Sequence, residues 1–190
     1  MTLAKHINAW LLLASLAGCA SPDPVYYTLQ PEPGPTLQGA PARVEIRRPG
    51  LAGYLDRATI VLRAQNYRLN VKGEILWGEP LGDMVGRVLA QDLAQRLPAS
   101  TVFAEGGAIT ADPDIRVEID IQRFDADSSG TVTLGGELAI EPGRAHIPTA
   151  TQTFDLTATP ADGSPAALVA TMSTLLGHLA DQTAATLHGG

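Results

Sequence analysis

Cysteine is almost absent from this chain of 190 residues, which has a single Cys, and its 13 Lys and Arg are outnumbered by 20 acidic residues. One Cys excludes an internal disulfide framework and a multi-Cys zinc or iron–sulfur centre. The net charge of −7 argues against nucleic acid as a partner, because binding to a phosphate backbone requires a basic face. Aromatic residues make up only 5% of the chain, yet its length and aliphatic content suffice for one domain with a hydrophobic core.

The motifs that accompany catalysis and nucleotide binding are also missing. The sequence has no Gly-x-Gly-x-x-Gly or Walker phosphate loop, no Gly-x-Ser-x-Gly elbow, and no His pair at zinc-ligand spacing. Beyond the N-terminal segment, the three histidines at positions 146, 178 and 188 are scattered. We therefore expect no enzymatic activity, no cofactor and no metal site.

Residues 125–130 copy only the first half of a calcium loop, with Asp or Ser at alternate positions before Gly130. Counted from Asp125, the twelfth position should hold a bidentate Glu. Gly136 occupies that position, and Glu137 comes one residue late. Because strand-like sequences flank the segment, a polar hairpin turn explains these residues better than calcium binding.

The N-terminal segment has the three parts of a secretory signal. Lys5 gives it a weakly positive start, and the apolar run at residues 9–17 is too short to cross a bilayer as a helix. Leu-Ala-Gly-Cys at residues 16–19 also matches the bacterial lipobox, and the only Cys of the chain takes the required position. We therefore expect residues 1–18 to be removed and Cys19 to carry lipid. A simple Sec signal with an incidental Cys is the alternative.

The residues after the cysteine predict the location of the anchored protein. In enteric bacteria, an Asp directly after the lipidated Cys favours retention in the inner membrane. This chain has Ala20 at that position, so we expect the protein at the periplasmic face of the outer membrane. Two prolines make residues 19–24 an extended tether to a single domain at residues 25–190. Without Lys5 the mature chain carries 12 cations and 20 acids, so the lipid and not the overall charge would hold it at the membrane.

Alternation of apolar and polar residues predicts most of the strands. The clearest strand, at residues 115–122, has Ile and Val on one face and charged or polar side chains on the other. Residues 132–140 and 151–159 follow it as an antiparallel meander, with a bulge expected at residues 135–136. Earlier in the chain, residues 72–73 are expected to form a turn between two short strands. Six shorter strands are expected at residues 26–29, 44–47, 59–63, 67–71, 75–77 and 101–104.

Two segments have the periodicity of amphipathic helices. Residues 81–97 form the first, in which Asp83 and Arg87 are spaced for an i,i+4 ion pair. Residues 165–187 form the second, capped by Ser164, and the scarcity of cations on its polar face favours packing on the sheet over binding to a membrane. The predicted fold class is α/β of the α+β kind: a mixed β-sheet with an antiparallel C-terminal meander, covered by two amphipathic helices.

Several short motifs follow one another along the mature chain. Tyr-Tyr-Thr-Leu at residues 26–29 comes soon after the lipobox, and Tyr-Leu-Asp-Arg at residues 54–57 follows the strand that begins at residue 44. Ile-Val-Leu-Arg at residues 60–63 forms the next strand, and Trp-Gly-Glu-Pro-Leu at residues 77–81 leads into the first helix. In this order, and over nearly all of the mature chain, the motifs resemble those of the ABC-type transport auxiliary lipoproteins, the PqiC-like subunits of membrane-integrity transporters.

The resemblance implies an outer-membrane lipoprotein that serves as the auxiliary or docking subunit of an MCE-type ABC lipid transport system and contributes to envelope integrity. Its implied partners are an MCE-domain protein that spans the periplasm and an inner-membrane permease with its ATPase. The family brings no catalytic residues to this chain. A homo-oligomeric docking ring is left open, because no heptad pattern predicts a stoichiometry.

Four residues of these motifs, Tyr54, Asp56, Arg57 and Trp77, are candidate site residues. As structural residues, Asp56 and Arg57 would close a turn by hydrogen bonds, and the two aromatic residues would be partly buried anchors. As docking residues, they include the types that dominate protein interfaces. We favour the structural role. The alternative function for the whole protein is a periplasmic lipid-carrying chaperone with its own apolar pocket.

Overall fold

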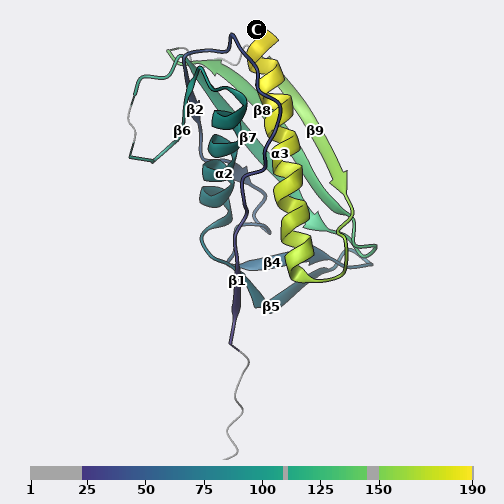
Figure 1. The fold of residues 1–190 in the computed structure, drawn as a ribbon. Coiled ribbons are helices and arrows are strands. Elements are labelled where there is room, and N and C mark those ends of the chain that lie inside the picture. Colours follow the sequence, from purple (N-terminus) through teal and green to yellow (C-terminus); the bar gives the residue numbers. More distant parts are fainter. Residues whose placement is uncertain (1–22, 109–110, 145–149, 190) are drawn as a thin grey trace, which may run out of the picture.

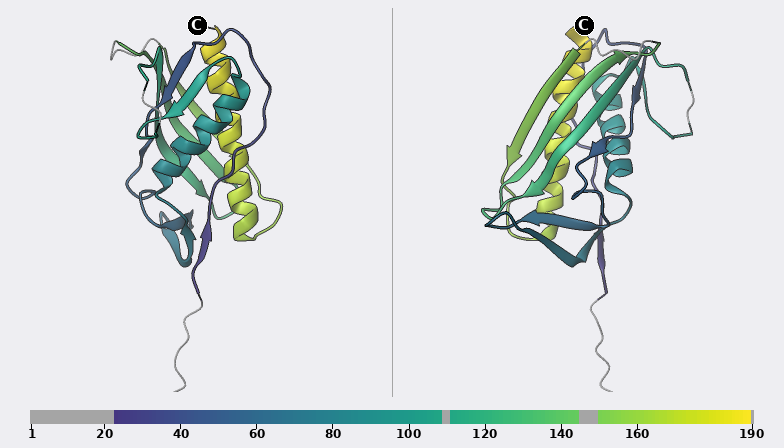
Figure 2. Two further views of the ribbon diagram at one scale, coloured as in Figure 1. Left: turned by 60° about the vertical axis from the view of Figure 1, so that its left-hand side comes forward. Right: turned by 180° about the vertical axis from the view of Figure 1, so that it is seen from behind.

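The computed structural model describes residues 23–108, 111–144 and 150–189, which form nine strands and two helices. Both helices lie on one face of a single mixed sheet, as the view from behind shows most clearly (Figures 1 and 2). The elements are, in chain order, β1 (Val25–Tyr27), β2 (Arg43–Ile46), β3 (Gly50–Leu51), β4 (Thr59–Arg63), β5 (Leu69–Trp77), α2 (Leu81–Arg96), β6 (Thr101–Ala104), β7 (Ile115–Ala126), β8 (Val132–Pro142), β9 (Ala150–Ala158) and α3 (Pro165–Gly189).

Strand β7 is the centre of the sheet because it has neighbours along both of its edges. Antiparallel β8 covers one edge and β9 pairs with β8, so these three strands form the expected meander. The other edge takes three short parallel strands in succession, β2, β3 and β4. Strand β6 lies beyond β2, whereas β5 and then β1 lie beyond β4. The predicted fold class is therefore confirmed.

Two details of the sheet differ from the sequence-based expectations. The prediction of a turn at residues 72–73 is wrong, because β5 continues through these residues as one strand. The pairing of β5 with β4 is irregular, since its register shifts between Thr59 and Val61 of β4, as at a β-bulge. A bulge does lie opposite residues 135–136 in the meander. Its extra residue, however, is Gln122 on the facing strand β7.

The two helices bury their apolar stripes against the sheet and against each other. Leu93 of α2 and Leu176 and Leu179 of α3 are fully buried in one continuous hydrophobic cluster. Burying each such side chain stabilises the fold by about 1.5–3 kcal/mol. Ser164 is the expected N-cap of α3, since its Oγ accepts a hydrogen bond from the N–H of Ala167 at 3.1 Å.

A segment at residues 28–42, which we call the strap, passes along α2 and α3 on the side away from the sheet (Figure 1). The N–H of Gln30 donates to Ser173 Oγ of α3 at 3.1 Å, and the N–H of Leu37 donates to the carbonyl of Arg96 at the end of α2 at 2.7 Å. Its many prolines predict only a loop that stands free of the sheet. The structure shows that this loop binds the outer side of both helices.

Arg96 fastens the strap to both helices from a position that is only 1% exposed. Its guanidinium donates to the Asp181 carboxylate at 2.6 Å and to the carbonyls of Glu32 and Gly177 at 3.0 Å. Asp92, one turn earlier on α2, accepts a hydrogen bond from the N–H of Glu32 at 2.7 Å, and burial raises the pKa of Asp92 to about 6. These residues form what we call the Arg96 cluster.

Candidate functional site

The candidate site is built on the turn between β3 and β4, which contains the Tyr-Leu-Asp-Arg motif. The N–H of Ala52 donates to the carbonyl of Ile121 on β7 at 2.9 Å, and the N–H of Leu55 donates to the carbonyl of Ala52 at 2.8 Å. The N–H of Arg57 donates to the carbonyl of Leu55 at 2.9 Å, so backbone groups close this turn. The side chain of Leu55 is buried in the core, which fixes the turn against the sheet.

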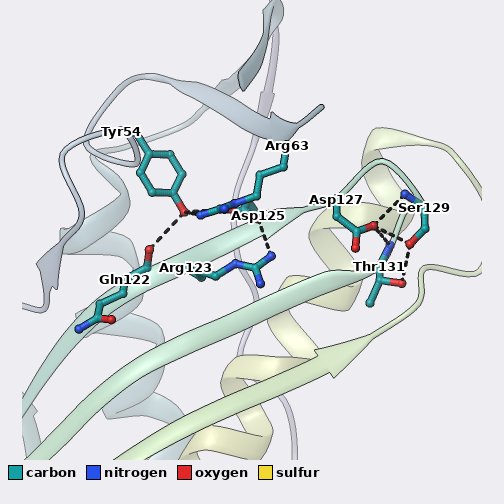
Figure 3. A network of polar contacts seen from close by, with 8 residues as sticks. All are labelled: Tyr54, Arg63, Gln122, Arg123, Asp125, Asp127, Ser129 and Thr131. Atoms are coloured by element: carbon teal, nitrogen blue, oxygen red, sulfur yellow. Dashed lines mark hydrogen bonds and ion pairs between the residues drawn. The ribbon is translucent and has the colours of Figure 1, made fainter. Parts of the chain in front are cut away.

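Asp125, near the end of β7, has a fully buried carboxylate that three side chains contact (Figure 3). The Tyr54 hydroxyl donates to its Oδ2 at 2.5 Å, and Arg63 Nε of β4 donates to the same oxygen at 2.9 Å. Arg123 Nη2 donates to Oδ1 at 3.2 Å. The Arg63 guanidinium also lies 5.5 Å from the centre of the Tyr54 ring. We call these four residues the Asp125 clamp; it joins the turn to β4 and β7.

Burial and hydrogen bonding determine the electrostatics of the Asp125 clamp. Burial, aided by the hydrogen bond to Asp125, raises the pKa of Tyr54, so its hydroxyl stays protonated at neutral pH. Hydrogen bonds to Tyr54 and Asp125 raise the pKa of Arg63. The side chains of Arg63 and Arg123 are 41% and 36% exposed, so water solvates both cations while the anion depends on protein donors. The arrangement joins the turn to β4 and β7, and within it the Nε of Arg123 is buried without a hydrogen-bond partner.

The segment that copies half a calcium loop forms the hairpin turn between β7 and β8. Asp127 Oδ1 accepts hydrogen bonds from the Oγ of Ser129 at 2.6 Å, from the N–H of Ser129 at 2.8 Å and from the N–H of Thr131 at 3.2 Å (Figure 3). The bonds from Ser129 lower the pKa of Asp127. In the described part of the chain, no group of three or more His, Cys, Asp or Glu residues is placed to hold a metal ion.

The four candidate site residues divide into two kinds. Trp77 is buried in the core, and its backbone N–H donates to the carbonyl of Ala58 at 2.7 Å, so it anchors the end of β5 beside the turn. Tyr54 is half-buried in the Asp125 clamp. Asp56 and Arg57 are exposed, and neither side chain forms a hydrogen bond or ion pair with another described residue. The two aromatic residues are thus buried or half-buried, whereas the two charged residues face solvent.

A groove crosses the first turns of α2 beside this turn. Two adjoining hollows of about 300 and 640 Å³ share Arg48 and Gly82 in their walls. The Arg48 guanidinium pairs with Asp83 at 2.7 Å, and Arg87 pairs with Glu79. The predicted ion pair between Asp83 and Arg87 is therefore wrong, because each has a partner outside the helix. We call this surface the α2 groove; its polar walls comprise Arg48, Asp56, Glu79, Gly82, Asp83, Arg87 and Glu105.

An apolar hollow of about 260 Å³ lies beneath the β4–β5 hairpin. Ile60, Leu62, Ile75 and Leu168 line it, and the β7–β8 turn and the start of α3 form its polar rim. Ordinary ligand sites enclose roughly 300–1,000 Å³. The hollow is therefore small for the acyl chain that a lipid carrier would have to hold.

Sequence patterns located the turn but missed the residue that holds it. The sequence does indicate that the Asp125 carboxylate is buried, because Asp125 stands between Phe124 and Ala126 at the end of an apolar strand. An unpaired carboxylate there would be costly, which implies partners such as Arg63. Arg48, which links both hollows of the α2 groove, has no comparable signal.

Several predictions concern residues 1–22 and His146, which lie outside the described residues. These predictions include the signal segment and the lipid at Cys19. Among the helices that the structure describes, none is long and apolar enough to cross a membrane.

The sheet with both helices on one face defines the chain as a two-layer α/β protein of a fold that solved structures share. A Xanthomonas campestris protein described as DUF330 is 19% identical, with a TM-score of 0.70 over 86% of this chain and 94% of that one. An uncharacterized protein is 16% identical, with a TM-score of 0.67 over 88% of this chain and 98% of the other. At these identities the likeness concerns the fold alone. No curated protein matches the sequence.

The family follows from the sequence itself. Residues 27–184 match the ABC-type transport auxiliary lipoprotein component family, a span that includes β2 to β9, the Asp125 clamp and the α2 groove. The chain belongs to this family, which confirms the resemblance of its motifs. It is thus an auxiliary lipoprotein component of an ABC-type transport system.

Proposed function

We propose that the protein is the docking subunit of an MCE-type ABC lipid transport system and contributes to envelope integrity. The observation that carries the proposal is the family match over residues 27–184, since an auxiliary component acts by binding the transporter that it assists. Its partners in this proposal are an MCE-domain protein that spans the periplasm, the inner-membrane permease and the ATPase. The role is binding and not catalysis.

The docking surface in this proposal is the α2 groove together with Asp56 and Arg57. Both charges face solvent without a partner among the described side chains, next to a groove whose walls alternate in charge. Such a surface favours a partner with complementary charges, which fix register and speed association more than they add affinity. The Asp125 clamp supports it by holding the turn rigid, which lowers the entropic cost of docking.

The N-terminal residues support a proposal for the position of the protein in the cell envelope. In our proposal Cys19 carries lipid, residues 19–24 form the tether, and Ala20 directs the protein to the periplasmic face of the outer membrane. A lipid-anchored subunit there could receive the far end of a bridge that starts at the inner membrane.

The competing function is a lipid-carrying chaperone. The apolar hollow of about 260 Å³ is the only support for it in the described residues, and its volume is small for that task. The larger hollow of the α2 groove has apolar residues such as Ile46 and Ala104 in its wall, but its five charged side chains do not suit an acyl chain.

In vivo crosslinking followed by pull-down of the tagged full-length protein tests the docking role. We expect an MCE-domain protein among the crosslinked species. Asp56→Arg should reduce its recovery severalfold, whereas Asp155→Arg, the same change at an exposed site on β9, should not. Recovery of lipid without any transporter component would reject the docking role and favour the lipid carrier.

A further inference from the structure

The large hydrophobic side chains that the described residues leave exposed all lie on two neighbouring elements. Tyr67, Leu69 and Val71 belong to the β4–β5 hairpin, and Val25 and Tyr26 belong to β1. Strand β1 pairs in parallel with residues 75–77 of β5, so Val25 and Tyr26 lie at the opposite end of that strand from Leu69. We call this surface, with its five members, the hairpin patch. Large apolar side chains that are exposed together on neighbouring elements are typical of an interaction surface.

The tip of the hairpin holds an aromatic ring out into solvent at a cost in backbone strain. Asn66 and Tyr67 have φ values of 59° and 60°, in the left-handed region. Asn tolerates this conformation, but a bulky residue such as Tyr rarely adopts it. Tyr67 is nevertheless fully exposed, at 108% of its reference area, so no packing within the described chain explains why the ring is held there.

The charge of the hairpin is opposite to that of the whole chain. Residues 58–77, which include both strands of the hairpin, contain three cations and one acid, Glu74, whereas the chain as a whole has a net charge of −7. Arg63 is bound in the Asp125 clamp, but Arg68 is exposed and forms no ion pair with another described residue. The nearest carboxylates at the hollow beneath the hairpin, Asp127 and Asp162, cap the turns that contain them. Tyrosine and aliphatic side chains beside cations are the combination that binds a bilayer interface.

The hairpin patch also lies at the end of the molecule at which β1 begins. The β4–β5 hairpin extends across the end at which β1 begins (Figures 1 and 2). Val25 is the sixth residue after Cys19, so a lipid at Cys19 would keep β1 within about 20 Å of its point of insertion. The hairpin is therefore the part of the fold that the anchor brings closest to the membrane.

We propose that the hairpin patch is a membrane-contact surface, in which Tyr67 and its neighbours enter the headgroup region of the bilayer that holds the lipid anchor. This inference rests on the proposed lipid at Cys19, but it goes beyond docking because it fixes the orientation of the domain. With the hairpin on the bilayer, the C-terminal end of α3 points into the periplasm. Addition of a partner strand to β5 fits less well, because the bulge and the strained tip interrupt the open edge.

Site-directed fluorescence on the full-length lipidated protein tests the contact. Because Cys19 would be consumed by lipid, Tyr67→Cys offers one free thiol for an environment-sensitive dye, and Arg68→Cys gives a second probe if the first perturbs the tip. Ala99→Cys, at an exposed position after α2, is the matched control. The labelled proteins are reconstituted into phosphatidylethanolamine–phosphatidylglycerol vesicles, with and without brominated lipid, and isolated by flotation.

The dye at position 67 should shift to the blue, resist iodide severalfold better than the dye at position 99, and be quenched by brominated lipid. Co-flotation with equal iodide access at both positions would overturn the membrane contact and leave the anchor standing. Protection from iodide without quenching by brominated lipid would indicate a second copy of the chain on the patch and would also overturn it. Failure to float would overturn both the anchor and the contact that depends on it.

Discussion

Two buried ionic groups hold this fold, and they are built in opposite ways. The Arg96 cluster buries a cation, and backbone carbonyls from the strap and from α3 complete its hydrogen bonds. The Asp125 clamp buries an anion, and its partners are the Tyr54 hydroxyl and two arginines that are partly exposed. The first group joins the strap and two helices in the interior, whereas the second pins one surface turn beside the α2 groove.

The difference predicts unequal consequences of mutation. Loss of the buried guanidinium leaves the fully buried Asp92 carboxylate without its cation and the Glu32 carbonyl without this donor, so the interior bears the cost. Arginines that lose a buried carboxylate are already partly solvated and can turn outward. The Arg96 cluster should therefore govern global stability, and the Asp125 clamp should govern the local order of the turn.

The largest effect is expected for Arg96→Met, which keeps the length of the side chain but removes its charge and donors. It leaves Asp92 and the carbonyls of Glu32 and Gly177 without their partner, and we expect a loss of about 3–5 kcal/mol in the free energy of unfolding. Urea denaturation followed by circular dichroism measures it. Arg87→Met on the same helix is the control; its exposed ion pair with Glu79 should contribute less than about 1 kcal/mol. Equal losses in the two variants would contradict the contrast.

The next effect concerns pH and the same cluster. The folded-state pKa of Asp92, about 6, lies above its ordinary value of 3.8, so between these values the folded state binds more protons than the unfolded state. The stabilising contribution of this group is complete below about pH 4 and is lost as the pH rises through 6. Relative to Asp92→Asn, the wild type should therefore lose on the order of 2–3 kcal/mol across that window. Parallel stability profiles for the two proteins would show that burial does not perturb Asp92.

Asp125→Asn should have a smaller effect, because its partners remain hydrated. It replaces one acceptor oxygen by an amide that faces arginine donors, and we expect a loss of about 2 kcal/mol. Asp114→Asn is the matched control, since its ion pair with Arg43 is exposed and its loss should leave stability nearly unchanged. Hydrogen exchange should show faster opening of residues 52–58 in the first variant only. An unchanged turn would mean that the Asp125 clamp does not hold it.

Tyr54→Phe should have the smallest effect. It removes one hydroxyl from the Asp125 clamp and keeps the ring, so we expect a loss of about 1 kcal/mol with the sheet intact. Thermal unfolding measures the change. A loss as large as that of Arg96→Met would place Tyr54 among the residues that determine global stability.

Local patterns predicted those parts of the fold in which neighbouring residues determine the structure. The alternation at residues 115–122 identified β7, and the spacing of leucines identified both helices. The strap and the Arg96 cluster were not predicted, because Glu32, Asp92 and Gly177 meet only through contacts between distant segments. For the candidate site, the motif located the turn, but Asp125 lies 71 residues beyond Tyr54 and 62 beyond Arg63, so no local pattern predicts these contacts.

The central claim is that the α2 groove and its neighbouring turn bind the transporter. Its most direct test is site-specific photocrosslinking in the native envelope, with the photoreactive residue at position 57 and, separately, at position 99. We predict an adduct with an MCE-domain protein at position 57 and none at position 99. An adduct of equal yield at both positions, or at position 99 alone, would contradict the assignment of the docking surface.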